Sequence, residues 1–517
     1  MKIATGDIMR RIDKRAVQES GIKSEVLMEN AGLAVADFVS DLAAAGKPSC
    51  VLVLCGKGNN GGDGLVAARL LAKKKNRVLA VMFARKEEVA GDVKLNLAKC
   101  ARENVKVRHI TLSKDFEDLK KEFTSCDVIV DALLGTGFRG AVSGFLSNVM
   151  DFVNSCPGLV VSVDLPSGLN SSTGQIAGAC VKADYTVTFG LNKLGLCIHP
   201  GLEYAGQVLV ADIGLPETAV DRENIRTNLV EAADAALLFP ERRPDCNKGS
   251  LGRVFIAGGS PGMTGAPCMS GLSALRSGCG LVTLGVPESS CAIVESKTLE
   301  LMTRPLPETA AKTFSLKAGA RLLEMLQGYN VLALGPGLGR DKDTASFVRM
   351  LVAECPIPLV LDADGLTLMA NHVEDFAKTK APVIITPHPG EMSRLIGVNV
   401  DFVQGARVET AREFAKRFGV VVVLKGARTV TASPEGEVFV NSTGNCGMAT
   451  AGTGDVLTGV IASFVAQGAK PLNAAILGTY IHGLAGDLAK NIFGEHGLIA
   501  SDVTANIPAA IRNTLSK

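Results

Sequence analysis

The chain has 517 residues, too many for one hydrophobic core, and this length predicts two to four domains. Hydrophobic residues make up 47% of it and charged residues 21%, a composition typical of a globular α/β protein. The formal net charge of +2 gives no reason to expect nucleic acid or an anionic membrane as the main partner.

The 13 cysteines are scattered without a CxxC pair, which is typical of reduced core cysteines rather than of a disulfide or zinc framework. The first twenty residues lack the apolar stretch of a signal peptide, and no apolar run approaches the length of a membrane span. We therefore expect a cytoplasmic protein that neither enters nor crosses a membrane.

The first clear strand, CVLVLC at residues 50–55, leads directly into the glycine-rich sequence GKGNNGGDG and then a helix from Leu65. Strand, glycine turn and helix open a doubly wound nucleotide-binding unit. Asn59, Asn60 and Asp63 add oxygen atoms that suit a hard cation or a ligand's hydroxyl groups better than a pyrophosphate. A plain NAD-dependent dehydrogenase is therefore disfavoured.

Polar residues also follow two later strands of this half. Asp131 ends the strand in DVIVDALLGTGFRG, and Asp164 and Ser167 follow the strand in LVVSVDLPSGLN. Each could be an ordinary cap or turn residue. Because ligands bind at the carboxyl ends of strands in an open parallel sheet, we expect these residues and Asn60 to meet in one crevice. The set indicates acid/base or isomerising chemistry, with Asp164 as the proton carrier.

A charged, proline-bearing stretch predicts a linker at residues 216–245, between domains at 1–215 and 246–517. The second domain again alternates strands with helices, which predicts a mostly parallel sheet covered on both faces.

The glycine-rich sequence NCGMATAGTGDVLTG at 445–459 dominates the second domain. Glycines let backbone N–H groups close on a phosphate, and the helix that follows adds its positive end. Asp455 in this loop reads as a general base aimed at a hydroxyl group or as a metal ligand, the alternative being a helix N-cap. Lys425, after the apolar run VVVL, either extends to solvent or meets an anion.

These motifs carry a family resemblance. With GTGD at Gly452–Asp455, the second domain resembles the ribokinase-like superfamily, and GPGLG, PHPGEM and LKGART make it similar to the ADP/ATP-dependent NAD(P)H-hydrate dehydratases. The first domain, with NNGGDG, DALLGTGFRG and DLPSG, resembles the NAD(P)H-hydrate epimerases. The resemblance implies two doubly wound, three-layer α/β domains, the first Rossmann-like and the second ribokinase-like.

The resemblance also implies the reactions. The first domain would interconvert the R and S forms of NADH or NADPH that carry a hydroxyl group on C6 of the nicotinamide ring (NADHX and NADPHX). The second would phosphorylate that hydroxyl group in the S form, with ADP or ATP as donor, and lose phosphate to restore NAD(P)H. Magnesium would accompany the nucleotide, ADP is the expected donor, and a homo-oligomer is the family expectation.

Site residues follow from the matched motifs. Asp164 and Asp455 are the implied catalytic residues, and Asn60, Asp131 and Ser167 match the family's potassium site. The hydrate-binding positions are Asn59, Asn60, Gly61, Gly62, Asp63, Gly135, Thr136, Gly137, Phe138, Arg139, Gly140 and Ala141 in the first domain, and Ala266, Gly337 and His388 in the second. The nucleotide-binding positions are Lys425, Gly426, Ala427, Arg428, Thr429, Asn445, Gly447, Met448, Ala449, Thr450, Ala451, Gly452, Thr453 and Gly454.

Two alternatives remain at this point. A vitamin-precursor kinase of the same superfamily would share the GTGD loop, although GPGLG and PHPGEM favour the dehydratase. A first domain that only binds nucleotides or partners would lose the oxygen ligands that this chain keeps at Asn60, Asp131 and Asp164.

Overall fold

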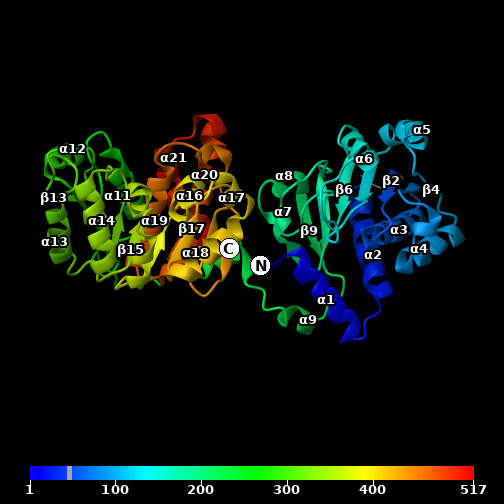
Figure 1. Ribbon diagram of the computed structural model, residues 1–517, viewed down its shortest axis with the longest axis horizontal. Coiled ribbons are helices and arrows are strands. Elements are labelled where there is room, and N and C mark those ends of the chain that lie inside the picture. The colour runs from blue at the N-terminus through cyan, green and yellow to red at the C-terminus, as the bar shows by residue number, and fades with distance from the viewer. Residues whose placement is uncertain (43–48, 517) are drawn as a thin grey trace. The chain divides into compact units, whose positions relative to one another are not determined.

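The computed structural model describes residues 1–42 and 49–516, and the chain forms two compact units (Figure 1). The N-terminal unit comprises residues 2–225, and the C-terminal unit comprises residues 226–517 together with Met1. Residues 43–48 and 517 belong to the two predicted domains but lie outside the described residues.

The N-terminal unit contains a seven-stranded, entirely parallel sheet with the order β4-β3-β2-β5-β6-β7-β9. The order reverses between β2 and β5, so the loops after these two strands diverge and leave a crevice at the carboxyl edge of the sheet. Its strands are β2 (Cys50–Cys55), β3 (Arg77–Met82), β4 (Val107–His109), β5 (Val128–Ala132), β6 (Leu159–Val163), β7 (Tyr185–Phe189) and β9 (Gln207–Ala211). A separate two-stranded sheet pairs β1 (Ile3–Ala4) with β8 (Asn192–Lys193).

Alternate side chains of each strand enter opposite cores of this unit. Val51 and Val53 of β2 pack with α2, α3 and α4, whereas Leu52 and Leu54 pack with α5 and α6 on the other face. Apolar residues on both faces make the strands continuous hydrophobic runs, as a sheet covered twice requires. The helices are α1 (Gly6–Gln18), α2 (Ser24–Leu42), α3 (Asn59–Lys73), α4 (Gly91–Arg102), α5 (Ser113–Thr124), α6 (Phe145–Val153), α7 (Leu194–Cys197), α8 (Gly201–Ala205) and α9 (Glu217–Asp221).

Helix α3 begins earlier than the sequence predicted. Its first residue is Asn59, so NNGGDG forms the first two turns of the helix rather than a loop. The glycines allow this close approach to the sheet, because a Cβ on Gly61 would lie 1.8 Å from the carbonyl oxygen of Gly56. Asn60 and Asp63 are therefore held on a helix and not on a mobile turn.

The C-terminal unit contains a ten-stranded sheet with the order β10-β19-β18-β17-β16-β15-β14-β11-β12-β13. All its pairs are parallel except β17 with β18 and β18 with β19. The strands are β10 (Thr227–Val230), β11 (Arg253–Ala257), β12 (Leu281–Pro287), β13 (Met302–Leu306), β14 (Val331–Leu334), β15 (Leu359–Leu361), β16 (Val383–Ile385), β17 (Val421–Leu424), β18 (Val430–Ala432) and β19 (Val438–Asn441).

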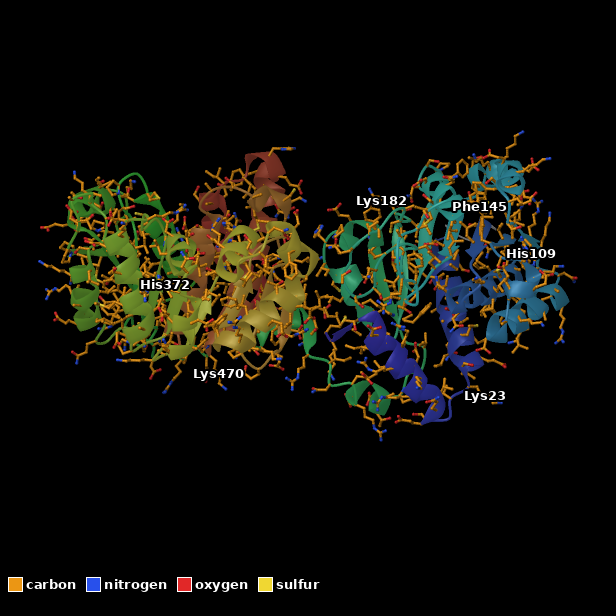
Figure 2. All side chains as sticks on the ribbon, in the orientation of Figure 1. Lys23, His109, Phe145, Lys182, His372 and Lys470 are labelled. Carbon is orange, nitrogen blue, oxygen red and sulfur yellow. The ribbon has the colours of Figure 1, made fainter. Side chains whose placement is uncertain are left out.

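One face of this sheet is covered by α11, α19, α20 and α21, whose apolar residues form a core of the unit. Helices α13 to α18 complete the layers. Figure 2 labels Lys470, an exposed residue at the start of α20. The helices are α10 (Ala232–Ala236), α11 (Gly265–Arg276), α12 (Cys291–Glu295), α13 (Leu316–Met325), α14 (Lys342–Glu354), α15 (Ala363–Met369), α16 (Pro389–Ile396), α17 (Val400–Gly405), α18 (Arg407–Phe418), α19 (Thr453–Ala466), α20 (Pro471–Gly497) and α21 (Ala500–Leu515).

The prediction of two doubly wound α/β domains is confirmed. Three short elements, α9, β10 and α10, occupy part of the segment predicted as a linker, and β10 joins the C-terminal sheet beside β19. Within residues 1–42 and 49–516, no helix is both long and apolar enough to cross a membrane.

Candidate active sites

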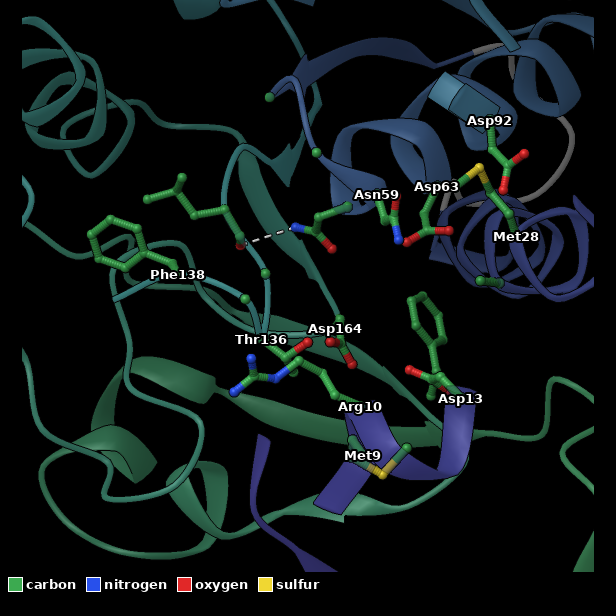
Figure 3. Close-up of a pocket in the computed structure, with 18 of the residues that line it drawn as sticks. Met9, Arg10, Asp13, Met28, Asn59, Asp63, Asp92, Thr136, Phe138 and Asp164 are labelled. Atoms are coloured by element: carbon green, nitrogen blue, oxygen red, sulfur yellow. Dashed lines mark hydrogen bonds between the residues drawn. The ribbon is translucent and has the colours of Figure 1, made fainter. Parts of the chain in front are cut away.

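The N-terminal unit has a cavity of about 910 Å³ at the point where the strand order reverses (Figure 3). Its walls come from the loops after β2 and β5, the start of α3, the residue after β6, and helix α1. The carboxyl edge of the sheet is where the sequence placed the crevice.

Most of the predicted hydrate-binding residues of this unit line the cavity. Those that do so are Asn59, Asn60, Asp63, Gly135, Thr136, Gly137 and Phe138. The lining does not include the remaining predicted positions, Gly61, Gly62, Arg139, Gly140 and Ala141. The guanidinium group of Arg139 instead donates to Asp7 Oδ1 at 2.6 Å. The cavity lining thus includes the polar side chains of NNGGDG and the first part of GTGFRG, but not residues 139–141.

Asp164 lies directly after β6 and forms an ion pair inside the cavity. Lys193 Nζ is 2.7 Å from Asp164 Oδ1, and it also donates to the carbonyl oxygen of Phe189 at 2.7 Å. Thr188 Oγ1 donates to the same carboxylate at 3.2 Å. Asp164 has φ +64°, a backbone conformation that non-glycine residues adopt at a cost and that is frequent at functional sites. Asp164 is thus held by a buried lysine and is more than a turn residue.

Two further carboxyl groups, Asp13 and Asp63, lie near this ion pair. The pKa of Asp13 is raised to about 6, chiefly by burial, which Lys193 opposes and Asp164 reinforces. Burial also holds the pKa of Asp63 well above its ordinary value, and both Asp164 and Asp13 add to the effect. The cavity therefore combines a close lysine–aspartate pair with carboxyl groups that keep a proton more readily, which is the arrangement of acid/base sites.

The predicted potassium ligands form one hydrogen-bonded network behind the cavity. Ser167 Oγ and the Ser167 backbone N–H donate to the two Asp131 oxygens at 2.6 and 2.8 Å. Asn60 Nδ2 and Ser167 Oγ both donate to the carbonyl oxygen of Leu134, at 3.0 and 3.2 Å. Burial raises the pKa of Asp131 although these donors oppose the shift. The structure thus brings Asn60, Asp131 and Ser167 together as a set of oxygen donors, the ligand type of hard cations.

In the C-terminal unit a second lysine–aspartate pair lies at the carboxyl ends of two strands. Lys425, after β17, places Nζ 2.6 Å from Oδ1 of Asp362, after β15. Thr458 Oγ1 of α19 donates to the other Asp362 oxygen at 2.7 Å. Burial by itself raises the pKa of Asp362, but Lys425 and Thr458 outweigh it and lower that pKa. Lys425 also lies 3.7 Å from Glu391 Oε2.

Asp455 stands in the first turn of α19, and the N-cap of this helix is Gly452. The alternative interpretation of Asp455 as an N-cap is therefore excluded. Burial raises the pKa of Asp455 to about 7; Asp362 adds to the shift and Lys425 opposes it. A carboxyl group with a pKa near neutrality is poised to accept a proton at the helix terminus where an anion is favoured.

The two predicted nucleotide-binding segments meet beside Lys425. A Cβ on Gly454 would lie 3.4 Å from Lys425 Nζ, so the start of α19 and the lysine are in close contact. Asn445 fixes the start of its loop by donating to Asp487 and accepting from the Gly447 N–H. Thr453 Oγ1 closes the loop by donating to the carbonyl oxygens of Met448 and Thr450.

The buried Arg407 supports the other segment, Lys425–Thr429, through hydrogen bonds to its backbone. Its guanidinium group donates to the carbonyl oxygens of Leu424, Lys425 and Ala427. Burial lowers the pKa of Arg407 to about 10, so the group stays charged at neutral pH.

His388 caps α16 rather than lying in a surface turn. Its Nδ1 accepts from the N–H groups of Gly390 and Glu391 at 3.0 and 3.3 Å, so Nε2 carries the ring proton of the neutral form. Burial and the nearby Lys425 lower its pKa and favour this neutral form. The Lys425 N–H donates to the carbonyl oxygen of Pro387 at 2.8 Å, which places His388 beside the lysine.

Ala266 and Gly337, the other two predicted hydrate-binding positions of this unit, lie close to each other. A Cβ on Gly337 would lie 3.4 Å from that of Ala266, and Ser270 Oγ donates to the carbonyl oxygens of both Ala266 and Asp455. The predicted hydrate-binding and nucleotide-binding positions of this unit are therefore linked by contacts around Asp455.

Five residues at these two sites were missed by reasoning from the sequence: Asp13, Lys193, Asp362, Glu391 and Arg407. Asp362 could have been found, because it directly follows the apolar strand of LVLDADGL as Asp164 follows its own strand. Asp13, Glu391 and Arg407 lie on helices, and no local pattern distinguishes them from surface charges.

Comparison with known proteins finds relatives of both units. Residues 254–509 match the family described as NAD(P)H-hydrate dehydratase, and residues 24–195 match the family described as YjeF-related protein N-terminus. A bifunctional NAD(P)H-hydrate repair enzyme of Moorella thermoacetica is 42% identical over 99% of this chain and 97% of its own length. The enzyme of the same name from Thermofilum pendens is 40% identical over 99% and 96%.

A solved structure is similar to the C-terminal unit. It is the ADP/ATP-dependent NAD(P)H-hydrate dehydratase of Bacillus subtilis, co-crystallised with ATP and Mg²⁺, with 30% identity and a TM-score of 0.50. The match covers 56% of this chain and 98% of that protein, which confirms the ribokinase-like prediction for this unit. With both units matched in order over the full length, the chain belongs to the family of bifunctional NAD(P)H-hydrate repair enzymes.

Proposed function

We propose that the two units divide the repair of hydrated NADH and NADPH between them. The cavity of the N-terminal unit interconverts the R and S epimers at C6 of the hydrated nicotinamide ring, and the C-terminal site dehydrates the S epimer to NAD(P)H. The observation that carries the division is the position of Asp455, whose carboxyl group lies in the first turn of α19 beside Lys425. Such a base at a helix terminus suits phosphoryl transfer to a hydroxyl group.

In the dehydratase reaction, Asp455 removes the proton of the C6 hydroxyl group as its oxygen attacks the terminal phosphorus of ADP or ATP. The backbone N–H groups of the glycine-rich loop and the ammonium group of Lys425 stabilise the charge on the transferred oxygens. Phosphorylation turns hydroxide, a poor leaving group, into phosphate, a good one. Loss of that phosphate from C6 and of a proton from C5 restores the ring double bond.

Mg²⁺ would bind chiefly through the phosphates of the nucleotide, as it usually does in kinase sites, and would neutralise part of their charge. The nearby carboxylates of Asp362 and Asp455 are oxygen donors of the type that this ion prefers. Either ADP or ATP fits a loop that grips the inner phosphates, and we propose ADP as the donor on the expectation for the fused family.

In the epimerase reaction, Asp164 exchanges a proton with the substrate beside Asn59, Thr136 and Phe138. Potassium is proposed at Asn60, Asp131 and Ser167, together with the carbonyl oxygen of Leu134. The shared hydrogen-bonded network of these oxygen donors supports it. Bound there, the ion would hold the loops after β2 and β5 at a fixed separation.

Two coarser properties complete the proposal. We expect a homo-oligomer, as for the family, and a cytoplasmic enzyme, in keeping with thirteen cysteines that all remain free thiols.

The test follows absorbance at 340 nm while the full-length protein receives mixed R and S NADH hydrate with Mg²⁺, K⁺ and either ADP or ATP. Recovery of NADH from both epimers supports the two activities, and the faster nucleotide identifies the donor. Recovery of only the S fraction would reduce the N-terminal unit to a binding module. No recovery, with phosphorylation of a vitamin-precursor alcohol instead, would replace the proposal by a kinase.

A further inference from the structure

Helix α1 (Gly6–Gln18) forms one wall of the N-terminal cavity, although the matched family region of this unit begins only at residue 24. Met9, Asp13 and Val17 line the cavity from this helix. On another side of the helix, Ile12 and Ala16 are fully buried. The helix therefore closes the cavity as a packed element of the unit.

Ion pairs fix the position of this wall. Arg11 Nε and Arg15 Nε contact the two carboxylate oxygens of Glu223 at 2.6 and 2.9 Å, and the Glu223 side chain is only 4% exposed. Thr5 caps the start of the helix by accepting from the Ile8 N–H. A side chain on the cavity face of α1 is consequently held in a defined place, as a catalytic group must be.

Asp13 is such a side chain, and it opens into the cavity near the Lys193–Asp164 pair (Figure 3). The charged groups that line the same cavity are Arg10, Lys14, Lys57, Asp63, Glu88, Asp92, Asp164 and Lys193. Among the lysines and arginines of this set, Lys193 is buried and already paired with Asp164, whereas Arg10, Lys14 and Lys57 are exposed. Asp13 is itself exposed, opening into the cavity, so it can reach a bound substrate. The surrounding cavity still raises its pKa to about 6, close to neutrality.

Inversion at C6 needs one acid and one base. If the bond from C6 to the hydroxyl oxygen breaks, a proton must reach that oxygen, and the water that adds to the other face must lose one. If instead the bond from C6 to the ring nitrogen breaks, the hydroxyl group loses its proton and the nitrogen gains one, and ring closure reverses both transfers. In either route the protons balance, and two carboxyl groups in different states of protonation suffice.

We propose that Asp13 is the second proton carrier of the epimerase, acting with Asp164 from the wall formed by α1. The inference rests on the proposed epimerase function of this cavity and adds a catalytic residue to it. Lys193 is the positioning residue that holds Asp164 as the partner of opposite protonation. Asp63 is the weaker candidate, because its burial favours a permanently protonated carboxyl group that serves as a hydrogen-bond donor.

The test measures both activities in the full chain with one trace. Mixed NADH hydrate, ADP, Mg²⁺ and K⁺ should give two phases at 340 nm: a fast phase from the S epimer and a slower phase set by conversion of R to S. In D13N the slow phase should fall by about 100-fold or more towards the rate measured without protein, the usual effect of losing a proton carrier. The fast phase should keep its wild-type rate. The matched control is D41N, an exposed aspartate of α2 outside the cavity lining, which should preserve both phases.

D13E separates catalysis from folding. Because glutamate restores the carboxyl group with a different reach, D13E should recover at least tenfold of the slow phase lost in D13N. A slow phase of wild-type rate in D13N would overturn the proposal, and so would a D13E variant that melts like the wild type yet is no faster than D13N. Absence of the slow phase in the wild-type protein would instead refute the epimerase function itself.

Discussion

Each unit holds its candidate site at the carboxyl edge of its own sheet, but the residues around the two sites differ. Each has a lysine–aspartate pair at the carboxyl edge of a parallel sheet, Lys193 with Asp164 at 2.7 Å and Lys425 with Asp362 at 2.6 Å. Each also has a further carboxyl group whose pKa is raised towards neutrality, Asp13 to about 6 and Asp455 to about 7.

The difference lies in what surrounds the pair. In the N-terminal unit the pair borders a cavity whose walls come from loops, from the start of α3 and from α1. In the C-terminal unit the pair lies beside the first turn of α19, where a helix N-terminus favours an anion. We therefore expect a similar ion pair to support proton exchange in both units and phosphate binding in the C-terminal unit alone.

The largest expected effect is that of D455N on the C-terminal reaction. Loss of the general base should lower the rate of S-hydrate dehydration by about 10²–10⁴-fold. Conversion of R to S, measured by chromatography of the hydrates, should be unchanged, because Asp455 belongs to the other unit. A variant that still dehydrates at more than a tenth of the wild-type rate would remove Asp455 from the base role and end the parallel between the two sites.

The reciprocal change, D164N, should leave dehydration intact and slow epimer exchange by about 10²–10³-fold, because the amide cannot accept a proton. The epimerisation rate is measured with purified R hydrate and no nucleotide. Unchanged exchange would assign the proton transfers of this cavity to Asp13 and Asp63 alone.

Replacing Lys193 or Lys425 tests how much each lysine–aspartate pair contributes to the stability of its unit. K193M should destabilise its unit by about 3–5 kcal/mol, because it leaves the buried Asp164 without its cation. K425M should cost less stability, since the Lys425 side chain is 18% exposed whereas that of Lys193 is 2% exposed.

Hydrogen exchange, measured separately for peptides of each unit, reports the loss of stability in K193M and in K425M. The control is K193M with D164N, which removes the orphan charge and should regain stability without regaining epimerase activity. Equal losses in K193M and K425M would show that exposure does not distinguish the pairs.

Much of this arrangement follows from the sequence by one rule, that polar residues after consecutive parallel strands meet at one edge of the sheet. The rule predicted that Asn60, Asp131, Asp164 and Ser167 meet, and the structure brings them to the carboxyl edge of the N-terminal sheet. It applies equally to Asp362, which follows β15 and was not predicted.

The remaining features depend on packing between distant segments. Asp13 enters the cavity only because α1 is fixed through Glu223, more than 200 residues away in the sequence. Strand β10 comes from the segment predicted as a linker and pairs with β19, again a partner about 200 residues away. The α3 start was predicted too late because glycines are poor helix formers, and here they are needed for contact with the sheet.

The pH dependence of dehydration tests the role of Asp455 through a smaller change in rate. Asp455 must be ionised to accept a proton, so kcat/KM should be level above its pKa of about 7 and fall about tenfold per pH unit below it. In D455N, kcat/KM should no longer fall on the acid side, because this variant lacks the carboxylate that titrates. A wild-type profile that stays level down to about pH 5.5 would assign the role to a group of ordinary carboxyl pKa.

The smallest effect concerns the support of the nucleotide segment. Arg407 contacts three carbonyl oxygens of residues 424–427, and lysine can replace its charge but not its planar, branched set of donors. R407K should therefore raise KM for ADP by about 5–10-fold, an effect about the size of one ordinary hydrogen bond, with kcat and epimerase activity near wild type. R412K is the matched control, because Arg412 lies on the same helix but contacts Gly436 and Thr227 instead. If both variants raised KM equally, the effect would belong to α18 as a whole, and the carbonyl contacts of Arg407 would not be what shapes the segment for phosphate.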